Sequence, residues 1–221
     1  MVNQFVDYWR RYYKEGRSVS DSEFVSRLKL GGTDHDLNET EIQRVFLWKE
    51  PRRLPAMQGE KVFDSQFKIN KLNSFRFKAS DELVKFAKEQ CKNADSSLVK
   101  RYFICHIASP YEYPIWDRNA LRAHLIITNR LDQVKHVEEL IYKSEEYEEY
   151  RRNFNSWSKD VSEGRFSDGS TIPSFRMLDQ ALFSMGYFAN SFAPMFEGSA
   201  YSYGTSRTVS RIASKQPHRH S

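Results

Sequence analysis

Residues 113–118 read Tyr-Pro-Ile-Trp-Asp-Arg. This sequence is expected to fix both the direction and the negative charge of one carboxylate, that of Asp117. Pro114 fixes its own φ angle and keeps Tyr113 extended, so any helix upstream of this segment must end before it. Asp117 precedes a helical pattern over residues 118–128, where it can cap backbone N–H groups at the positive end of the helix dipole. This position favours the ionised carboxylate, which can stabilise positive charge on a bound molecule. Aspartate is also among the commonest helix N-caps, so a purely structural role for Asp117 is the alternative.

Aromatic side chains flank this aspartate and are candidates for binding a nucleic-acid base. Tyr111, Tyr113 and Trp116 lie just before it in the sequence. Stacking of a ring on a base contributes about 1–3 kcal/mol. The same rings are equally suited to packing the loop onto neighbouring helices. Phe175, in the last predicted helix, is a fourth candidate for a base pocket, with core packing as its alternative.

Basic residues near the same segment are candidates for phosphate contacts. Arg118 and Arg122 lie one helical turn apart, directly after the aspartate. Lys49 and Arg53 belong to the densest basic cluster of the predicted folded part. We therefore expect these four side chains to contact a nucleic-acid backbone, unless they are ordinary solvated surface residues.

Helical periodicity positions all of these residues, and it predicts an all-α fold. No segment shows the alternation typical of a long strand. Asn38, followed by Glu41, has the spacing of a capping box, and Ser80 precedes another helical pattern. Helices are predicted over residues 2–13, 20–29, 39–49, 80–89, 97–108, 118–128, 134–157 and 174–189. Residues 52–79 are predicted to be ordered but irregular, with room for one helix, and residues 164–170 to form a loop.

One compact helical domain is expected over residues 1–192, followed by a flexible tail over 193–221. Beyond Glu197 the chain is rich in serine and contains no acidic residue, whereas Arg207, Arg211 and Lys215 make it basic. Such a composition favours disorder because it offers little apolar surface to bury. The tail could seek phosphates or simply solubilise the chain.

The overall composition narrows the class of protein. The chain has 221 residues, 39% of them hydrophobic and 14% aromatic, with a net charge of +5. No apolar run approaches the ~20 residues of a membrane span, and no secretory signal is visible. Two cysteines, Cys91 and Cys105, provide neither a disulfide framework nor an iron–sulfur site, which favours a reducing, cytoplasmic setting. The histidines lack metal-ligand spacing and no cofactor motif occurs, so we expect neither a metal nor a cofactor.

Three segments share a likeness to one family. Residues 102–122 read Tyr-Phe-Ile-Cys-His-Ile-Ala-Ser-Pro-Tyr-Glu-Tyr-Pro-Ile-Trp-Asp-Arg-Asn-Ala-Leu-Arg, residues 45–49 read Val-Phe-Leu-Trp-Lys, and residues 175–186 read Phe-Arg-Met-Leu-Asp-Gln-Ala-Leu-Phe-Ser-Met-Gly. Together they resemble the helix-hairpin-helix DNA glycosylase superfamily, and most closely its compact prokaryotic branch with an 8-oxoguanine-glycosylase-like fold. The resemblance extends over about residues 40–190.

The resemblance implies an all-α enzyme that flips a damaged or modified nucleotide out of DNA and cleaves its glycosidic bond, in repair or anti-phage defence. Asp117 matches the family's carboxylate, which stabilises an oxocarbenium-like sugar and orients the attacking group. The family's Schiff-base lysine would fall near Ser97, so simple hydrolysis is expected, with Lys100, one turn further, as an alternative nucleophile. Ser97, at the end of the hairpin turn, is a further candidate DNA contact.

Two departures from the family pattern, the missing hairpin glycines and the missing lysine at Ser97, leave a second interpretation open. The hairpin turn over residues 92–97 reads Lys-Asn-Ala-Asp-Ser-Ser and lacks the family's phosphate-binding glycines. The chain could therefore be a non-catalytic descendant that binds nucleic acid or protein. A generic helical interaction domain, with Asp117 only a helix cap, is the third possibility.

Overall fold

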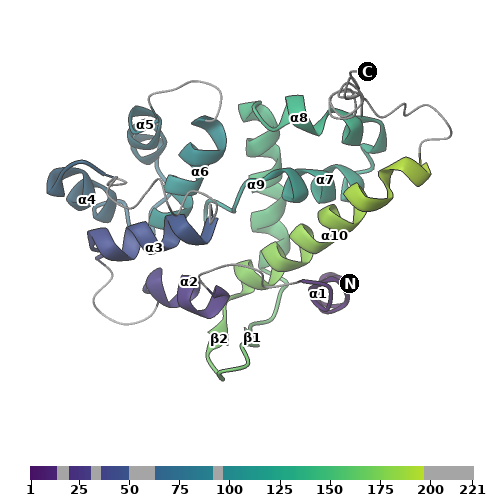
Figure 1. Cartoon of the computed structure of the whole chain (residues 1–221), viewed down its shortest axis with the longest axis horizontal. Helices are drawn as coiled ribbons and strands as arrows, with labels where there is room; N and C mark the ends of the chain where they lie inside the picture. The colour runs from purple at the N-terminus through teal and green to yellow at the C-terminus, as the bar shows by residue number, and fades with distance from the viewer. Residues whose placement is uncertain (14–19, 31–35, 50–62, 92–96, 197–221) are drawn as a thin grey trace, which may run out of the picture. The chain divides into compact units, whose positions relative to one another are not determined.

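Helices dominate the part of the chain that the computed structural model describes, namely residues 1–13, 20–30, 36–49, 63–91 and 97–196 (Figure 1). The prediction of an all-α fold is confirmed. Chain contacts define one compact unit over Met1–Asn190 and a second over Ser191–Ser221. The following account concerns the first unit. The predicted tail beyond Phe196 lies outside the described residues.

The elements follow one another in a simple order along the chain. The helices are α1 (Val2–Arg10), α2 (Asp21–Arg27), α3 (Glu39–Lys49), α4 (Gln66–Asn73), α5 (Asp81–Glu89), α6 (Ser97–Ala108), α7 (Arg118–Ile127), the 3-10 helix η2 (Leu131–His136), α8 (Val137–Leu140), α9 (Ser144–Ser158) and α10 (Ser174–Phe196). Between α9 and α10, strands β1 (Gly164–Arg165) and β2 (Thr171–Ile172) pair antiparallel, with Gly164 opposite Ile172.

Local side-chain signals set several helix starts as the sequence predicts. The Asn38 side-chain oxygen accepts a hydrogen bond from the Glu41 N–H at 3.0 Å, and the Glu41 carboxylate accepts one from the Asn38 N–H at 2.8 Å. This reciprocal pair is a capping box at the start of α3. Ser80 caps α5 by accepting a hydrogen bond from the Leu83 N–H at 3.1 Å.

Two predicted segments and the predicted domain end differ from the structure. The continuous helix over residues 134–157 is wrong, because η2, α8 and α9 divide that stretch. The Trp116 indole N–H donates to the Ile141 carbonyl at 2.9 Å, which gives that carbonyl a partner outside its own helix. Lys143 then adopts an extended backbone before α9. The loop predicted over 164–170 is the turn of the small β1–β2 hairpin and includes β1. α10 also extends beyond the predicted domain end at residue 192.

The core is built largely from aromatic rings contributed by several helices. Phe24 of α2 stacks on Trp48 of α3 with ring centroids 4.0 Å apart, and Tyr102 of α6 stacks on Tyr147 of α9 at 3.4 Å. All four side chains are buried. The first pair joins the consecutive helices α2 and α3, and the second joins α6 to α9, so the two pairs fix α3 on α2 and α6 on α9.

Close packing of α10 on α7 fixes the start of α7 (Figure 1). A Cβ atom at Gly186 would lie 1.9 Å from the Asn119 carbonyl oxygen and 2.6 Å from its carbonyl carbon. Only glycine permits so close an approach of two backbones. The first turn of α7, which follows Asp117, therefore rests directly on α10.

Candidate functional site

The Asp117 carboxylate is held by its own helix in the geometry that the sequence predicts. Its Oδ1 atom accepts hydrogen bonds from the backbone N–H groups of Asn119 and Ala120, both at 2.9 Å. The predicted N-cap is thus confirmed. Two backbone donors and the positive end of the α7 dipole stabilise the ionised carboxylate and fix its orientation.

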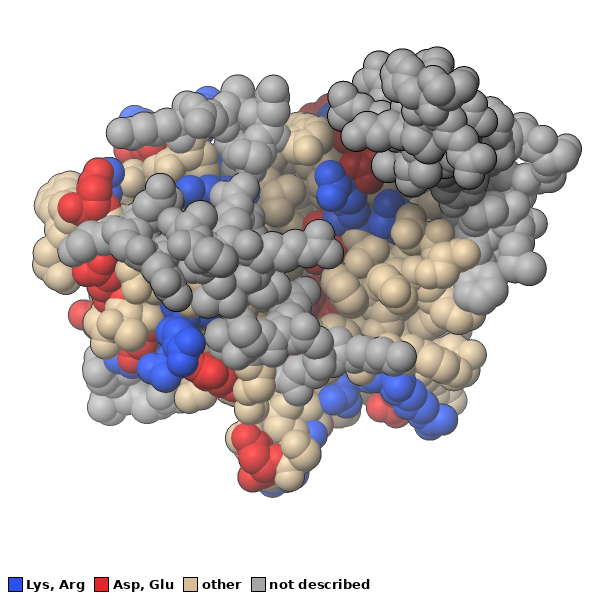
Figure 2. Space-filling view, viewed as in Figure 1, with Lys and Arg blue, Asp and Glu red and all other residues tan. Residues whose placement is uncertain are grey.

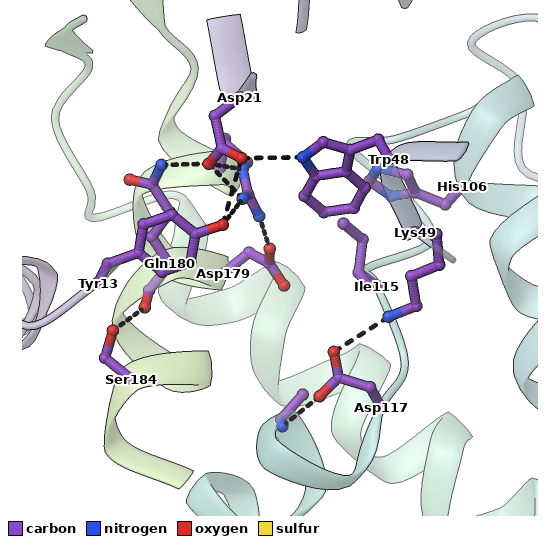
Figure 3. Close-up of polar contacts among 12 residues, drawn as sticks. Tyr13, Asp21, Trp48, Lys49, His106, Ile115, Asp117, Asp179, Gln180 and Ser184 are labelled. Carbon is purple, nitrogen blue, oxygen red and sulfur yellow. Dashed lines mark hydrogen bonds and ion pairs between the residues drawn. The ribbon is translucent and has the colours of Figure 1, made fainter. Parts of the chain in front are cut away.

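A lysine from another helix contacts the second oxygen of this carboxylate. The Nζ atom of Lys49, the last residue of α3, lies 3.0 Å from Asp117 Oδ2 (Figure 3). Only 10% of the Lys49 side chain and 23% of the Asp117 side chain are exposed, so solvent screens this ion pair incompletely. The ammonium group of Lys49, a predicted phosphate contact, faces Asp117 in the structure.

The ion pair lies in the wall of an open pocket of about 510 Å³. Arg118 and Arg122 of α7 line the same pocket, so the predicted basic residues do lie around the aspartate. Two aromatic side chains, Tyr142 and Phe183, also line it. The complete set of lining residues is Lys49, Val99, Asp117, Arg118, Asn119, Arg122, Ile141, Tyr142, Phe183 and Asn190.

The aromatic residues predicted for a base pocket lie elsewhere. Trp116, Tyr113 and Phe175 are buried in the core at 1–2% exposure, so their ring faces contact protein rather than the pocket. Trp116 packs against Tyr147 and Tyr150, and an aromatic ring so placed stabilises the loop. The base-pocket prediction for these three residues is therefore corrected in favour of their core-packing alternative.

Tyr111 is exposed, but it belongs to a different surface. Its ring packs edge-on against Phe175 at 5.0 Å, and it lines a second pocket of about 680 Å³ between α2 and the β-hairpin. Lys100 is exposed on α6 and is not one of the residues lining the Asp117 pocket. Ser97 begins α6, but its side chain lies outside the described part of the structure, as do residues 92–96 and Arg53.

Sequence reasoning missed the two rings that do line the pocket. Phe183 lies off the buried stripe of α10, and an aromatic residue outside such a stripe was the available signal. Its ring packs edge-on against Tyr13 at 5.9 Å. Tyr142 follows α8 in the turn that interrupts the predicted long helix, so that error also concealed its position.

A buried polar cluster near the Lys49–Asp117 ion pair was also missed (Figure 3). Arg176 of α10 pairs with Asp21 of α2 and with Asp179 one turn along, and all three side chains are buried. Asp21 also accepts hydrogen bonds from the Trp48 indole at 2.9 Å and from Gln180 at 2.7 Å. Buried charges require such partners, so this cluster fixes α2, α3 and α10 relative to one another.

Burial shifts the protonation of two groups near the site. Desolvation raises the pKa of Asp179 to about 6, although the Arg176 guanidinium opposes the shift. Desolvation lowers the pKa of His106 to about 3, although its hydrogen bond to the Tyr113 carbonyl at 2.7 Å opposes it. The His106 ring lies between Phe24 and Phe103, so it serves as a neutral member of the core at ordinary pH.

Within the described ranges, no group of three or more histidine, cysteine, aspartate or glutamate side chains is arranged to hold a metal ion. None of the helices described is both long and apolar enough to cross a membrane. Comparison of the chain with protein-family models, with curated proteins and with solved structures finds no match in any of the three.

Proposed function

We propose that this protein is a DNA glycosylase that hydrolyses the N-glycosidic bond of a damaged or modified nucleotide, with Asp117 as the essential carboxylate. One observation carries the proposal: Asp117 is fixed by two backbone N–H groups and Lys49 in the wall of a pocket bordered by Arg118 and Arg122. The resemblance of residues 102–122 to the core of helix-hairpin-helix glycosylases points the same way.

The orientation of the carboxylate suits this chemistry. Departure of the base leaves positive charge on the sugar, and a preorganised carboxylate stabilises that charge without reorganising. Both Asp117 oxygens have protein partners, so the side chain cannot rotate freely. Lys49 is then a positioning residue that holds Oδ2, and it also balances the carboxylate charge until substrate arrives.

The pocket suits a nucleotide taken out of the base stack. A volume of about 510 Å³ falls within the usual range for small-ligand sites. Flipping a nucleotide costs a few kcal/mol, and stacking on Tyr142 or Phe183 can offset that cost. The arginines at the rim provide partners for the negatively charged backbone.

The decisive experiment is an abasic-site assay on duplexes carrying 8-oxoguanine, uracil, alkylated bases or glucosylated hydroxymethylcytosine, beside unmodified DNA. Wild type, Asp117→Asn and Asp132→Asn are compared, each with and without hot alkali. Asparagine remains a good N-cap, so Asp117→Asn removes charge while it preserves α7. Asp132→Asn removes the same charge from an exposed position on η2. Alkali-dependent cleavage of one duplex by wild type and Asp132→Asn, but not by Asp117→Asn, is the expected result.

Cleavage without alkali would indicate an amine nucleophile instead of water. Lys100 is the alternative nucleophile, and loss of this cleavage in Lys100→Gln would assign it, because Lys100 is exposed on α6 and is not among the residues that line the Asp117 pocket. If the wild-type protein excises no base from any duplex of the panel, the glycosylase proposal is refuted.

The Lys49–Asp117 ion pair also favours a second candidate, a non-catalytic nucleic-acid-binding module. In such a module the pair would simply join α3 to α7, and neither residue would be needed for chemistry. Undiminished DNA binding by Asp117→Asn, together with no excision by wild type, is the result that this candidate predicts.

A further inference from the structure

A single glutamate bridges the two arginines at the rim of the Asp117 pocket. Glu138 of α8 lies with one carboxylate oxygen 2.7 Å from Arg118 Nε and the other 3.8 Å from Arg122 NH2. The Arg122 guanidinium also donates to the Asn119 side-chain oxygen at 3.0 Å. In Figure 2 basic atoms gather over α7, with acidic atoms next to them. One carboxylate thus occupies a position between two guanidinium groups.

The charges at this position are unbalanced in favour of an added anion. Arg122 is largely buried, with 13% of its side chain exposed, and desolvation lowers the pKa of its guanidinium. Glu138 and Asp117 oppose that shift, whereas Arg118 adds to it as a second cation. Around the pocket the three cations Lys49, Arg118 and Arg122 face the two carboxylates of Asp117 and Glu138, so one further oxyanion would be bound favourably there.

We propose that Arg118 and Arg122 form a subsite for one backbone phosphate of DNA, and that the Glu138 carboxylate occupies this subsite until DNA displaces it. The inference rests on the proposed function, because it assigns the backbone contact of the same pocket. Phosphodiester oxygens resemble a carboxylate in charge and hydrogen-bonding capacity, and the forked N–H donors of an arginine guanidinium bind both groups.

Glu138 is positioned to leave without disturbing the fold. Its side chain is 61% exposed, and exposed ion pairs contribute little to stability. The neighbouring Val137 and Leu140 are buried and anchor α8 in the core. A rotation of the Glu138 side chain alone therefore opens the subsite.

The location fits a phosphate rather than a free anion of another kind. Arg118, Arg122 and Asp117 line the same pocket. A nucleotide whose sugar faces Asp117 carries a phosphate on each side of that sugar. Its backbone must therefore cross the rim of the pocket, where the two arginines lie.

The test uses fluorescence anisotropy of a labelled 20-base-pair unmodified duplex at several salt concentrations. Glu138→Gln is compared with Glu139→Gln, which removes the same charge from the next, exposed position of α8. We expect Glu138→Gln to tighten binding about two- to fivefold, the factor that up to ~1 kcal/mol of surface ion pairing represents. Glu139→Gln should change binding by less than about twofold.

Replacing either arginine should have the opposite effect on DNA affinity. Arg118→Gln and Arg122→Gln should each weaken binding and make the slope of log K against log salt less steep, by about 1 for the two together because they share one phosphate. Arg118→Gln is the safer variant for folding, since 54% of its side chain is exposed. In Arg118→Gln protein, the further change Glu138→Gln should lose much of its tightening effect.

Three results would overturn the inference: equal tightening by Glu138→Gln and Glu139→Gln, no change on Glu138→Gln, or no duplex binding by the wild type. Equal tightening would show that net charge alone matters. Failure of the proposed function is distinguishable, because anisotropy does not require excision. Selective tightening by Glu138→Gln without excision from any modified duplex would leave the phosphate subsite standing and remove the glycosylase.

Discussion

Replacing Gly186 with alanine tests how strictly α10 fixes the start of α7. The added Cβ atom would lie 1.9 Å from the Asn119 carbonyl oxygen, and contacts below 3.0 Å are essentially never observed. The two helices must therefore separate locally by about 1.1 Å or more. The obstacle is backbone, which cannot rotate away as a side chain could.

Two free-energy contributions of opposite sign decide the outcome. Overpacking a well-packed core costs about 1–3 kcal/mol, and a clash with backbone belongs at the upper end of that range. Alanine in place of a helical glycine regains about 1 kcal/mol of helix propensity. We expect a net loss of about 2 kcal/mol in the free energy of unfolding, equivalent to a fall in Tm of about 4–8 °C for a chain of this size.

The same displacement should disturb Asp117. Asn119 donates its backbone N–H to Asp117 Oδ1 at 2.9 Å, so a shift of that residue weakens the bond that orients the carboxylate. Under the proposed function, a misplacement of about 1 Å lowers the excision rate by about 100-fold. Thermal unfolding followed by circular dichroism measures the first effect, and the abasic-site assay measures the second.

Gly164→Ala is the matched control. Its added Cβ would meet the Met177 sulfur at 2.7 Å, but a methionine side-chain end can move aside. Its Tm should stay within about 2 °C of wild type. A Gly186→Ala protein that is more stable than wild type, as helix propensity alone requires, would refute the close approach of α10 to α7.

Three further changes probe the core and the caps. His106 is buried in its neutral form, and burial lowers its pKa from 6.5 to about 3. Between these two pH values the unfolded state binds a proton that the folded state does not, so the free energy of unfolding decreases as the pH falls through this window. Relative to wild type, His106→Phe should therefore gain about 2 kcal/mol between pH 7.5 and pH 5 in urea unfolding, and parallel pH profiles would contradict the assignment. Asp21→Asn leaves the buried Arg176 with one charged partner fewer. It should lower the free energy of unfolding, measured in urea, by about 3 kcal/mol. A loss below about 1 kcal/mol would show that Asp179 alone is a sufficient partner for Arg176. Ser80→Ala should cost about 1 kcal/mol and Ser80→Gly only a few tenths, and equal losses would exclude a capping role for the Ser80 hydroxyl.

Features set by residues close in sequence could be predicted, whereas those set by distant partners could not. The caps by Asn38, Ser80 and Asp117 are local, because each side chain bonds to backbone two or three residues away. The break in the predicted helix over 134–157 coincides with a contact between Trp116 and Ile141, which periodicity within that stretch cannot reveal.

In the candidate site, too, the local features could be predicted and the contacts between distant residues could not. The sequence identified Asp117 and the two arginines that follow it, because all three lie in one helix start. The pairing of Lys49 with Asp117 spans 68 residues, and the bridge by Glu138 joins α7 to α8. Which aromatic rings face the pocket depends on how α10 is rotated in the fold, so Phe183 could not be distinguished from Phe175 by type alone.

The hydrogen bonds between the two ends of the Met1–Asn190 unit can form only late in the synthesis of the chain. The buried partners of Asp21 are Arg176 and Gln180, which lie 155 and 159 residues further along the chain. Arg10 bonds to Gln180 across 170 residues. At ribosomal speeds of about 5–20 residues per second, α2 emerges roughly 8–30 s before its buried partners exist. During that interval the Asp21 carboxylate stays in water, and Trp9 of α1 lacks the Phe188 ring of α10 against which it packs. The nascent chain should therefore depend on chaperones until α10 has left the ribosome, and a ribosome stalled before residue 174 should hold a protease-sensitive N-terminal region.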